Sequence, residues 1–252
     1  MSESTRPELR NIIAQQLPRC RPETWDELTA LVRISTFRRG ERIYELGEPV
    51  PLTMILSGYG VARRTTATGL LLISGVARAG APFGWSGLAG ETSSIEMIAH
   101  TSCRVAQWSG LDVRPLAAGD PELALAAIDS MAASLHQTIE QIEGFLHQNA
   151  RIRVLRILGR HRDLFFDDPA VLTRADLPGL VGTTREMTGR VLRQLEREGT
   201  IQRFGRFGLR LLRPEHLDGD GLGARSAPGT DRGRLGNSSS PFGRPPAHRC
   251  HT

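Results

Sequence analysis

The hydrophobic pattern of this 252-residue chain changes near Asp120, from short apolar runs to a helical period. Across residues 37–113 there is no helical period, and short apolar runs recur between glycines. Short strands separated by turn residues are typical of a β-sandwich or a β-barrel, so we predict such a fold for this stretch. The runs are residues 42–44, 52–56, 61–62, 70–73, 95–98 and 103–108.

Beyond Asp120 the apolar residues repeat with a helical period and form one long amphipathic stripe. The stripe is wider than the seam of a two-stranded coiled coil, so the helix can pack on the β domain and also pair with a second copy. A core helix of a monomer would show the same stripe, and this segment alone does not separate the two interpretations. The stripe consists of Ile128, Met131, Leu135, Thr138, Ile139, Ile142, Phe145 and Leu146.

Two shorter helices and a tail complete the chain outside its last folded unit. Thr24 followed by Glu27 resembles a capping box and predicts a helix over 24–34, and apolar spacing predicts another over 152–158. Residues 218–252 are rich in Gly, Pro, Ser and Arg, so we predict a disordered basic tail. Its potential metal ligands carry little weight without a preformed fold; they are His248, Cys250 and His251.

Residues 172–212 contain the most specific pattern in the chain. Thr173, followed three residues later by Asp176, predicts the start of a helix. Gly182 predicts its end, because glycine readily adopts the left-handed conformation found after helices. Pro178 lacks an N–H, so we expect it to remove a hydrogen bond and shorten this helix. The predicted buried face comprises Leu177, Leu180 and Val181.

A second helix and a hairpin follow in the same segment. Thr183 with Glu186 predicts a capping box, and Gly199 predicts the end of the helix. Residues 200–203 and 207–211 alternate about a turn at 204–206, which predicts a hairpin. Two short helices joined by a glycine-containing turn are the signature of a helix-turn-helix, here with a wing. The side chains expected to hold the second helix on the first are Met187, Val191, Leu192 and Leu195.

The predicted exposed face of the second helix begins with Arg185, Glu186, Gly189 and Arg190. Arginine can donate two hydrogen bonds to a guanine edge, and glutamate can accept one from the amino group of cytosine. The N-terminal end of a recognition helix is the part that enters the major groove. We therefore predict that Arg185, Glu186 and Arg190 contact DNA bases.

The charge of the chain supports an anionic partner only weakly. There are 32 Lys+Arg against 27 Asp+Glu, and every one of the cations is arginine. An all-arginine surface suits nucleic acid, because the guanidinium fork matches phosphate and guanine edges. A GC-rich coding sequence would produce the same absence of lysine, so both explanations stay open.

Cysteine spacing, the lack of long apolar runs and the lack of catalytic motifs limit which cellular compartment and which class of function we expect. Cys20, Cys103 and Cys250 are far apart without a CxxC pair, which favours reduced thiols. There is no apolar run of spanning length and no apolar signal core, so we expect a cytoplasmic chain without a membrane partner. HExxH, Walker and nucleophile-elbow motifs are absent, so we do not expect an enzyme.

The recognition-helix pattern, Arg185-Glu186 followed by Arg190, resembles that of the Crp/Fnr family of bacterial transcription regulators. Further upstream, several residues resemble the start of that family's cyclic-nucleotide-binding β roll, and 128–149 resembles its dimerisation helix. The upstream residues are Phe37, Arg39, Gly40, Glu41, Ile43, Tyr44, Gly47, Glu48, Pro49 and Gly58.

The resemblance implies an α+β chain: an N-terminal cyclic-nucleotide-binding-like β roll (jelly roll), a long dimerisation helix and a C-terminal winged helix-turn-helix. It also implies that Thr173, Thr184 and Arg206 contact phosphates. The implied dimer interface comprises Ile128, Met131, Leu135, Ile142 and Phe145. The expected parts are an N-terminal segment 1–22, a sensor domain 23–119, the dimerisation helix 120–149, the winged domain 150–217 and the tail 218–252.

The effector pocket implied by the family is atypical in this sequence. Where members that bind cyclic AMP have a ribose-binding Glu and a phosphate-binding Arg, this chain has Trp85 and the serine pair Ser93-Ser94. A buried phosphate without a counter-charge is costly to desolvate, so we expect cyclic AMP not to bind. The resemblance leaves as candidate lining residues for another effector Gly84, Trp85, Ser86, Ser93, Ser94 and Thr138.

Cofactors known from relatives are only partly excluded by the sequence. An iron-sulfur cluster of the four-cysteine type needs one more cysteine than this chain has, so we do not expect one. Haem is not excluded, because His100, His136 and His147 are present, although no ligand pair is fixed.

Together these observations predict a regulator that binds DNA as a homodimer on a pseudo-palindromic operator with G·C-containing half-sites. A signal at the β roll would modulate it, and RNA polymerase would be a further partner. The alternative is a ligand-sensing protein whose winged domain does not bind DNA specifically. The sequence does not indicate whether the protein activates or represses transcription, and it does not identify the effector.

Overall fold

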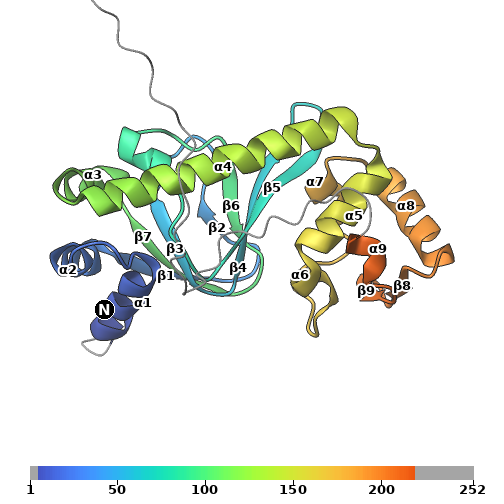
Figure 1. Cartoon of the computed structure of the whole chain (residues 1–252), viewed down its shortest axis with the longest axis horizontal. Coiled ribbons are helices and arrows are strands. Elements are labelled where there is room, and N and C mark those ends of the chain that lie inside the picture. The colour runs from blue at the N-terminus through green and yellow to red at the C-terminus, as the bar shows by residue number, and fades with distance from the viewer. Residues whose placement is uncertain (1–4, 219–252) are drawn as a thin grey trace, which may run out of the picture. The chain divides into compact units, whose positions relative to one another are not determined.

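Seven strands form two antiparallel sheets in the N-terminal half of the computed structural model, which describes residues 5–218 (Figure 1). The first sheet has the order β1-β7-β3, with bounds Arg33–Phe37, Cys103–Trp108 and Leu52–Ser57. The second has the order β2-β6-β4-β5, with bounds Arg42–Tyr44, Glu96–Ala99, Tyr59–Thr65 and Leu71–Arg78. These strands confirm the β architecture predicted from the glycine-punctuated runs.

Side chains of both sheets meet in one apolar core. Ile55 and Val105 from the first sheet pack with Ile43 and Met97 from the second. The turn between β3 and β4 needs a glycine at position 58, where φ is +82° and a Cβ would lie 2.1 Å from the Ser102 carbonyl oxygen. The two sheets therefore form a filled sandwich of the jelly-roll type.

Helices cover one end of the sandwich. Helix α1 (Thr5–Gln16) and helix α2 (Pro22–Leu31) contribute Leu9, Ile13 and Leu28 to a second core that includes Leu52 and Met54 of β3. A 3-10 turn, η1 (Trp85–Ala89), and helix α3 (Gly110–Gly119) lie before the long helix α4 (Pro121–His147). Figure 1 shows α4 extending from α3 along the β roll to helix α5 (Ala150–Arg160).

The first turn of α4 is fixed by Asp120, which is only 2 % exposed. Its carboxylate accepts hydrogen bonds from the Thr24 hydroxyl (2.7 Å), the Arg21 N–H (2.9 Å) and the Glu122 N–H (3.1 Å). Burial opposes its ionisation, but these hydrogen bonds outweigh burial and lower the pKa of the Asp120 carboxyl. Asp120 thus links helix α2 to the start of α4.

We expect Asp120→Ala to destabilise the fold by about 2–4 kcal/mol, since it removes a helix cap and leaves the buried Thr24 hydroxyl without its acceptor. Because the folded pKa is lowered, this stabilisation is present above the unfolded value of about 4 and is lost as the pH falls through the folded pKa. Urea unfolding at pH 7 and at pH 3 measures both effects. Asp129→Ala, at an exposed position of α4, is the control; equal stability of the two variants would contradict the prediction.

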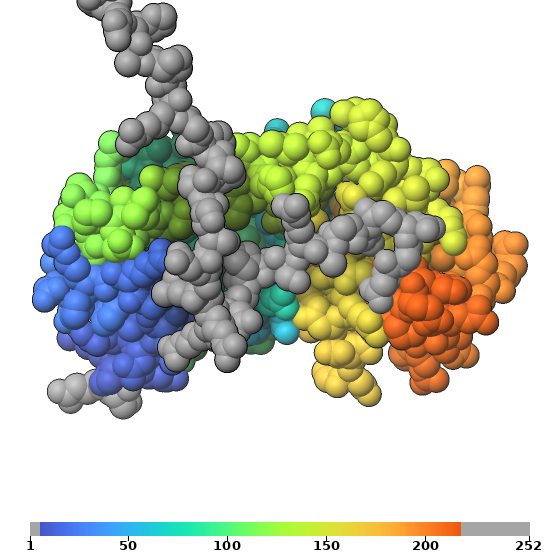
Figure 2. All heavy atoms as spheres, viewed as in Figure 1, coloured from blue at the N-terminus to red at the C-terminus, as the bar shows by residue number. Residues whose placement is uncertain are grey.

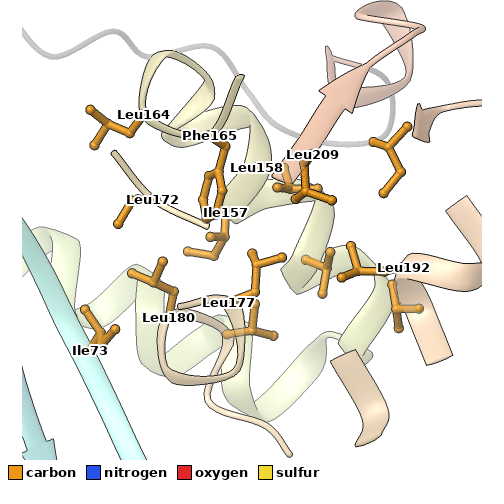
Figure 3. Close-up of a cluster of buried hydrophobic side chains, with 14 of the residues drawn as sticks. Ile73, Ile157, Leu158, Leu164, Phe165, Leu172, Leu177, Leu180, Leu192 and Leu209 are labelled. Atoms are coloured by element: carbon orange, nitrogen blue, oxygen red, sulfur yellow. The ribbon is translucent and has the colours of Figure 1, made fainter. Parts of the chain in front are cut away.

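The second part of the chain is a small helical domain with a two-stranded wing. Helix α6 (Arg162–Phe166) follows α5, helix α7 (Leu177–Val181) precedes helix α8 (Arg185–Arg197), and β8 (Ile201–Phe204) pairs with β9 (Gly208–Leu211) before helix α9 (Glu215–Asp218). Figure 3 shows Leu158, Phe165, Leu177 and Leu192 converging in its core, and Ile73 of β5 lies in the same cluster.

Several local predictions were wrong. The predicted capping box at Thr24 is absent, because α2 begins at Pro22 and the Thr24 hydroxyl donates its hydrogen bond to the Asp120 carboxylate. Pro178 removes no helical hydrogen bond, since it lies in the first turn of α7, where N–H groups have no intrahelical partner. Helices α1, α3 and α6 were not predicted. The predicted tail, 218–252, falls almost entirely outside the described residues.

Candidate nucleic-acid interface

Helix α8 begins directly after a tight turn that Gly182 makes possible. Gly182 ends α7 in the left-handed conformation, with φ +65°. Thr184 is the N-cap of α8, and its hydroxyl accepts a hydrogen bond from the Met187 N–H at 3.2 Å. The capping box predicted at Thr183 is therefore wrong by one residue, whereas the helix itself is confirmed.

One face of α8 is buried and holds the helix in place. Thr188, Val191, Leu192 and Leu195 are all buried. The last three belong to the core that α5 and α7 share, where Figure 3 labels Leu192. Met187, which the sequence placed on this face, is only half-buried. Because the apolar side is engaged, the opposite side of α8 faces solvent.

The residues predicted to contact bases lie on that exposed side. Arg185, Glu186 and Arg190 are all exposed, and the Arg190 guanidinium contacts the Glu186 carboxylate at 3.0 Å. An exposed ion pair at this spacing contributes only about 0.3–0.5 kcal/mol, so it is easily broken when a partner binds. The three side chains lie in the first two turns of α8, as a helix that inserts its N-terminal end into a groove requires.

The wing is attached to the helical pair by two arginines. Arg203 of β8 donates from its backbone N–H and its Nε to the Glu196 carboxylate of α8, at 2.9 Å and 2.8 Å. The guanidinium and N–H of Arg203 lower the pKa of the Glu196 carboxyl. Arg174, before α7, donates to the carbonyl oxygens of Gly205 and Arg206 in the wing turn. Neither contact could be predicted from the sequence, because Arg174 is more than 30 residues from its partners and Glu196 lies in a different element from Arg203.

A groove lies between the helix-turn-helix and the wing, with a volume of about 1060 Å³ including its open side. Its lining residues include no carboxylate. The charged side chains that line it are Arg174, Arg185, Arg203 and Arg206. Of these four cations only Arg203 forms an ion pair within the described residues, with Glu196. The groove therefore favours an extended anion such as a phosphate backbone.

The three residues predicted to contact phosphate differ in their exposure to solvent. The Thr173 hydroxyl is half-buried and donates to Asp176 at 2.9 Å. Thr184 is exposed beside the helix start, while its hydroxyl caps α8. Arg206 is exposed in the wing turn, with its guanidinium 5.0 Å from the centre of the Phe207 ring. Arg206 and Thr184 thus lie at the surface, and all three contacts remain predictions.

In the β roll, two of the predicted effector-pocket residues are engaged by the protein itself. Trp85 is buried in the core, and its indole N–H donates to the Pro82 carbonyl at 3.0 Å. The buried Ser93 hydroxyl donates to the Ile95 carbonyl at 2.7 Å. Gly84 φ is +85°, and a Cβ there would lie 2.3 Å from the Pro51 carbonyl oxygen. The remaining three candidates are exposed; they are Ser86, Ser94 and Thr138.

The candidate haem ligands do not form a shared site in the described part of the chain. His100 is half-buried, with Nε2 3.0 Å from the Val171 carbonyl oxygen, whereas His136 and His147 are exposed on α4. Within residues 5–218, no three His, Cys, Asp or Glu side chains are grouped to hold a metal ion. Burial raises the pKa of the Cys20 thiol to about 11. His248, Cys250 and His251 lie outside the described residues.

No helix within residues 5–218 is both long enough and apolar enough to cross a bilayer.

The fold defines a class of protein that joins a β roll, a long helix and a winged helix-turn-helix. Residues 146–219 match the Crp-like helix-turn-helix domain. The cAMP-activated global transcriptional regulator CRP of Salmonella typhimurium is 29% identical over 123 residues, which cover 46% of this chain and 59% of that protein. Vfr of Pseudomonas aeruginosa, another cAMP-activated global transcriptional regulator, is 31% identical over 122 residues, or 44% of this chain and 57% of that protein. The matched stretches thus span less than two thirds of these relatives.

Solved structures agree with the fold over a longer stretch. FixK2 from Bradyrhizobium japonicum superposes with a TM-score of 0.66 at 20% identity, covering 78% of this chain and 99% of that one. The c-di-GMP responsive global regulator CLP of Xanthomonas campestris superposes with a TM-score of 0.64 at 22% identity, covering 76% and 99%. The comparisons thus show a Crp-like helix-turn-helix domain over residues 146–219, and a fold over most of the chain that is similar to those of FixK2 and CLP.

Proposed function

We propose that this chain is a transcription regulator that binds DNA sequence-specifically and is not an enzyme. The observation that carries the proposal is the exposed set Arg185, Glu186 and Arg190 at the start of a helix whose opposite face is fully packed. Such a helix can enter the major groove and bring two guanidinium forks and one carboxylate to base edges. The arginine-lined groove beside it provides the cations for backbone contacts, which position the protein but carry no sequence information.

The match of residues 146–219 to the Crp-like helix-turn-helix domain supports this function. CRP and Vfr carry the name of global transcriptional regulators, and their similarity to this chain makes regulation of transcription the favoured role. Because a regulator of transcription acts where RNA is synthesised, we also propose RNA polymerase as a partner and the cytoplasm as the compartment.

We further propose that the chain acts as a homodimer through α4. The second half of this helix lies at the surface (Figure 2), and its apolar side chains are between 41% and 72% exposed. A stripe of this kind on one helix is the pattern by which two helices pair. Pairing would present two copies of α8 to half-sites about 34 Å apart on a pseudo-palindrome. The exposed members of the stripe are Ile128, Met131, Leu135, Ile139, Ile142, Phe145 and Leu146.

The regulating signal is proposed to differ from cyclic AMP, although CRP and Vfr are named as cAMP-activated. Trp85 occupies the position expected of the ribose-binding carboxylate and is packed into the core. The serine pair that stands in place of the phosphate-binding arginine is neutral, so a cyclic phosphate would lack a counter-charge. Calorimetric titration of the full chain with cyclic AMP is expected to show no micromolar binding.

Selection of binding sites from random duplex DNA tests the function as a whole. With the full-length chain as bait, we expect enrichment of a pseudo-palindrome whose half-sites contain G·C pairs and are about one helical turn apart. If the winged domain does not bind DNA specifically, the selection would recover DNA without enriching any sequence. That outcome would contradict the proposed function and favour a ligand-sensing protein without specific DNA binding.

A further inference from the structure

The end of α4, the start of α5 and the end of α7 enclose a second pocket, separate from the groove beside the wing. The space inside it that a water-sized molecule can reach is about 30 Å³, and the empty space is about 340 Å³ when the solvent at its open side is counted. Gly144 and Gln148 line it from α4 and the linker, Arg153 and Arg156 from α5, and Leu180 from α7. Gly144 is buried and leaves room here: a Cβ at this position would lie 3.4 Å from an Arg156 terminal nitrogen and 3.6 Å from the Gln148 side-chain oxygen.

Polar atoms in this pocket are buried without partners. Within the described residues, Nε of Arg153, Nε of Arg156 and Oε1 of Gln148 have no hydrogen-bond partner although each atom is buried. A buried polar group that makes no hydrogen bond costs about 1–3 kcal/mol, and more if it is charged. All three atoms belong to residues that line the one pocket. The guanidinium groups of Arg153 and Arg156 therefore have hydrogen-bonding capacity that the described residues do not use.

The charge of the lining residues identifies the sign of that ligand. Arg160 pairs with Glu140 at 3.1 Å, which neutralises one cation. Arg153 and Arg156 form no ion pair with any carboxylate in the described part of the chain, where their guanidinium groups donate hydrogen bonds only to the backbone oxygens of Gln148 and Glu140. Two guanidinium groups on successive turns of one helix are suited to a carboxylate or a phosphate.

The pocket also has apolar walls. Phe145 of α4, Ile157 of α5, and Leu180 and Val181 of α7 complete the pocket, and the Arg153 guanidinium lies 5.6 Å from the centre of the Phe145 ring. We propose that this pocket binds a small organic anion, whose carboxylate or phosphate head contacts Arg153 and Arg156 and whose apolar end contacts these walls. The proposed site is distinct from the β-roll pocket candidates.

An anion here would touch the recognition unit and the long helix at once. Leu180 and Val181 belong to α7, and the next residue, Gly182, is so close to Phe145 that a Cβ would lie 2.6 Å from the ring. Occupancy would therefore fix the helix-turn-helix relative to the end of α4 and change operator affinity. This regulatory role rests on the proposed DNA-binding function, whereas anion binding itself does not.

Calorimetric titrations of the full chain with benzoate, phenyl phosphate and neutral benzamide at constant ionic strength test the site. We expect at least one of the two anions to bind at least tenfold more tightly than benzamide, and the preferred anion distinguishes a carboxylate from a phosphate ligand. The double variant Arg153→Gln, Arg156→Gln is expected to bind that anion at least tenfold more weakly than the wild type. Arg39→Gln, at an exposed position, is expected to leave the affinity for the anion unchanged. Equal binding of benzamide, or unaltered binding by the double variant, would overturn the proposal.

Gly144→Ala provides a second test that does not depend on the arginine variants remaining folded. Alanine is favoured over glycine within a helix, so this variant is expected to melt no lower than the wild type. Its methyl group would occupy space between Arg156 and Gln148, and we expect several-fold weaker anion binding. Wild-type affinity in this variant would contradict the site.

The regulatory role is tested independently of anion binding, by measuring operator affinity with and without the bound anion. A change in operator affinity that Arg153→Gln with Arg156→Gln abolishes would support the coupling. Anion binding with unchanged operator affinity would overturn the coupling and leave the site intact. Failure of the protein to bind any DNA sequence specifically would instead refute the proposed function, whatever the titrations show.

Discussion

Replacing Arg185 and Arg190 together with alanine is expected to reduce operator affinity about 10³-fold or more, to the level of non-specific DNA binding. Each good bidentate contact between arginine and guanine contributes about 1–3 kcal/mol, and a dimer would lose four of them. Their sum reaches the roughly 4–10 kcal/mol that separates specific from non-specific binding. Stability should change little, because both side chains are exposed and, among residues 5–218, the only ion pair lost is the exposed one between Arg190 and Glu186.

Fluorescence anisotropy on the selected operator and on a scrambled duplex, at several salt concentrations, measures this effect. Arg206→Ala is the contrasting variant, and it should lower the affinity for both duplexes by a similar factor. Because a phosphate contact is lost in each subunit, the slope of log affinity against log salt concentration should fall by about 2 for a dimer. Arg39→Ala, exposed in the β roll, should change neither. If the Arg185 and Arg190 variant still prefers the operator, α8 is not the helix that reads the sequence.

The recognition helix could be predicted because its signals are local. The apolar positions Val191, Leu192 and Leu195 fix which face is buried, and this fixes the exposed face as well. The exact cap could not be predicted, since Thr183 and Thr184 are both good N-cap residues. The choice depends on how the chain leaves Gly182 in its left-handed conformation, which places the Thr184 hydroxyl opposite the Met187 N–H.

Other elements were missed for different physical reasons. Helix α1 has a usable signal, since Leu9, Ile13 and Leu17 repeat every four residues and are buried. Helix α3 contains Pro115 and is only ten residues long, so its pattern is short and interrupted. The sequence alone also cannot show that Arg153 lines a pocket, because the walls come from α4, α5 and α7, whose packing is tertiary.

The β roll shows how a resemblance can place a residue without giving its side-chain direction. Trp85 matches the position of a ligand-binding carboxylate in the family, and this predicted a place in the effector pocket. In the structure its ring joins the core with Trp108 and Leu123, and its N–H donates to the Pro82 carbonyl. A large apolar ring in the core is strongly favoured over exposure, so packing determined its direction.

Leu135→Glu is expected to convert the proposed homodimer to a monomer, with a dissociation constant at least about 10³-fold higher. Leu135 is 62% exposed in the single chain, so its apolar side chain contributes little to the core of one copy. In a paired α4 stripe it would be buried in both copies, and burial of each leucine would contribute about 1.5–3 kcal/mol. The variant would instead bury two carboxylates, which is costly without partners.

Light scattering after size-exclusion chromatography, over a range of concentrations, distinguishes monomer from dimer. Gln137→Glu is the matched control: it introduces the same charge at an exposed position of α4 outside the stripe, and it should remain dimeric. Operator affinity of Leu135→Glu should fall sharply, because a monomer engages only one half-site, while its melting temperature should no longer depend on protein concentration. A wild-type chain that is already monomeric at micromolar concentration, or a Leu135→Glu variant that stays dimeric, would show that α4 is not the interface. The DNA-binding proposal would then depend on a different arrangement of the two recognition helices, because α8 alone covers a single half-site.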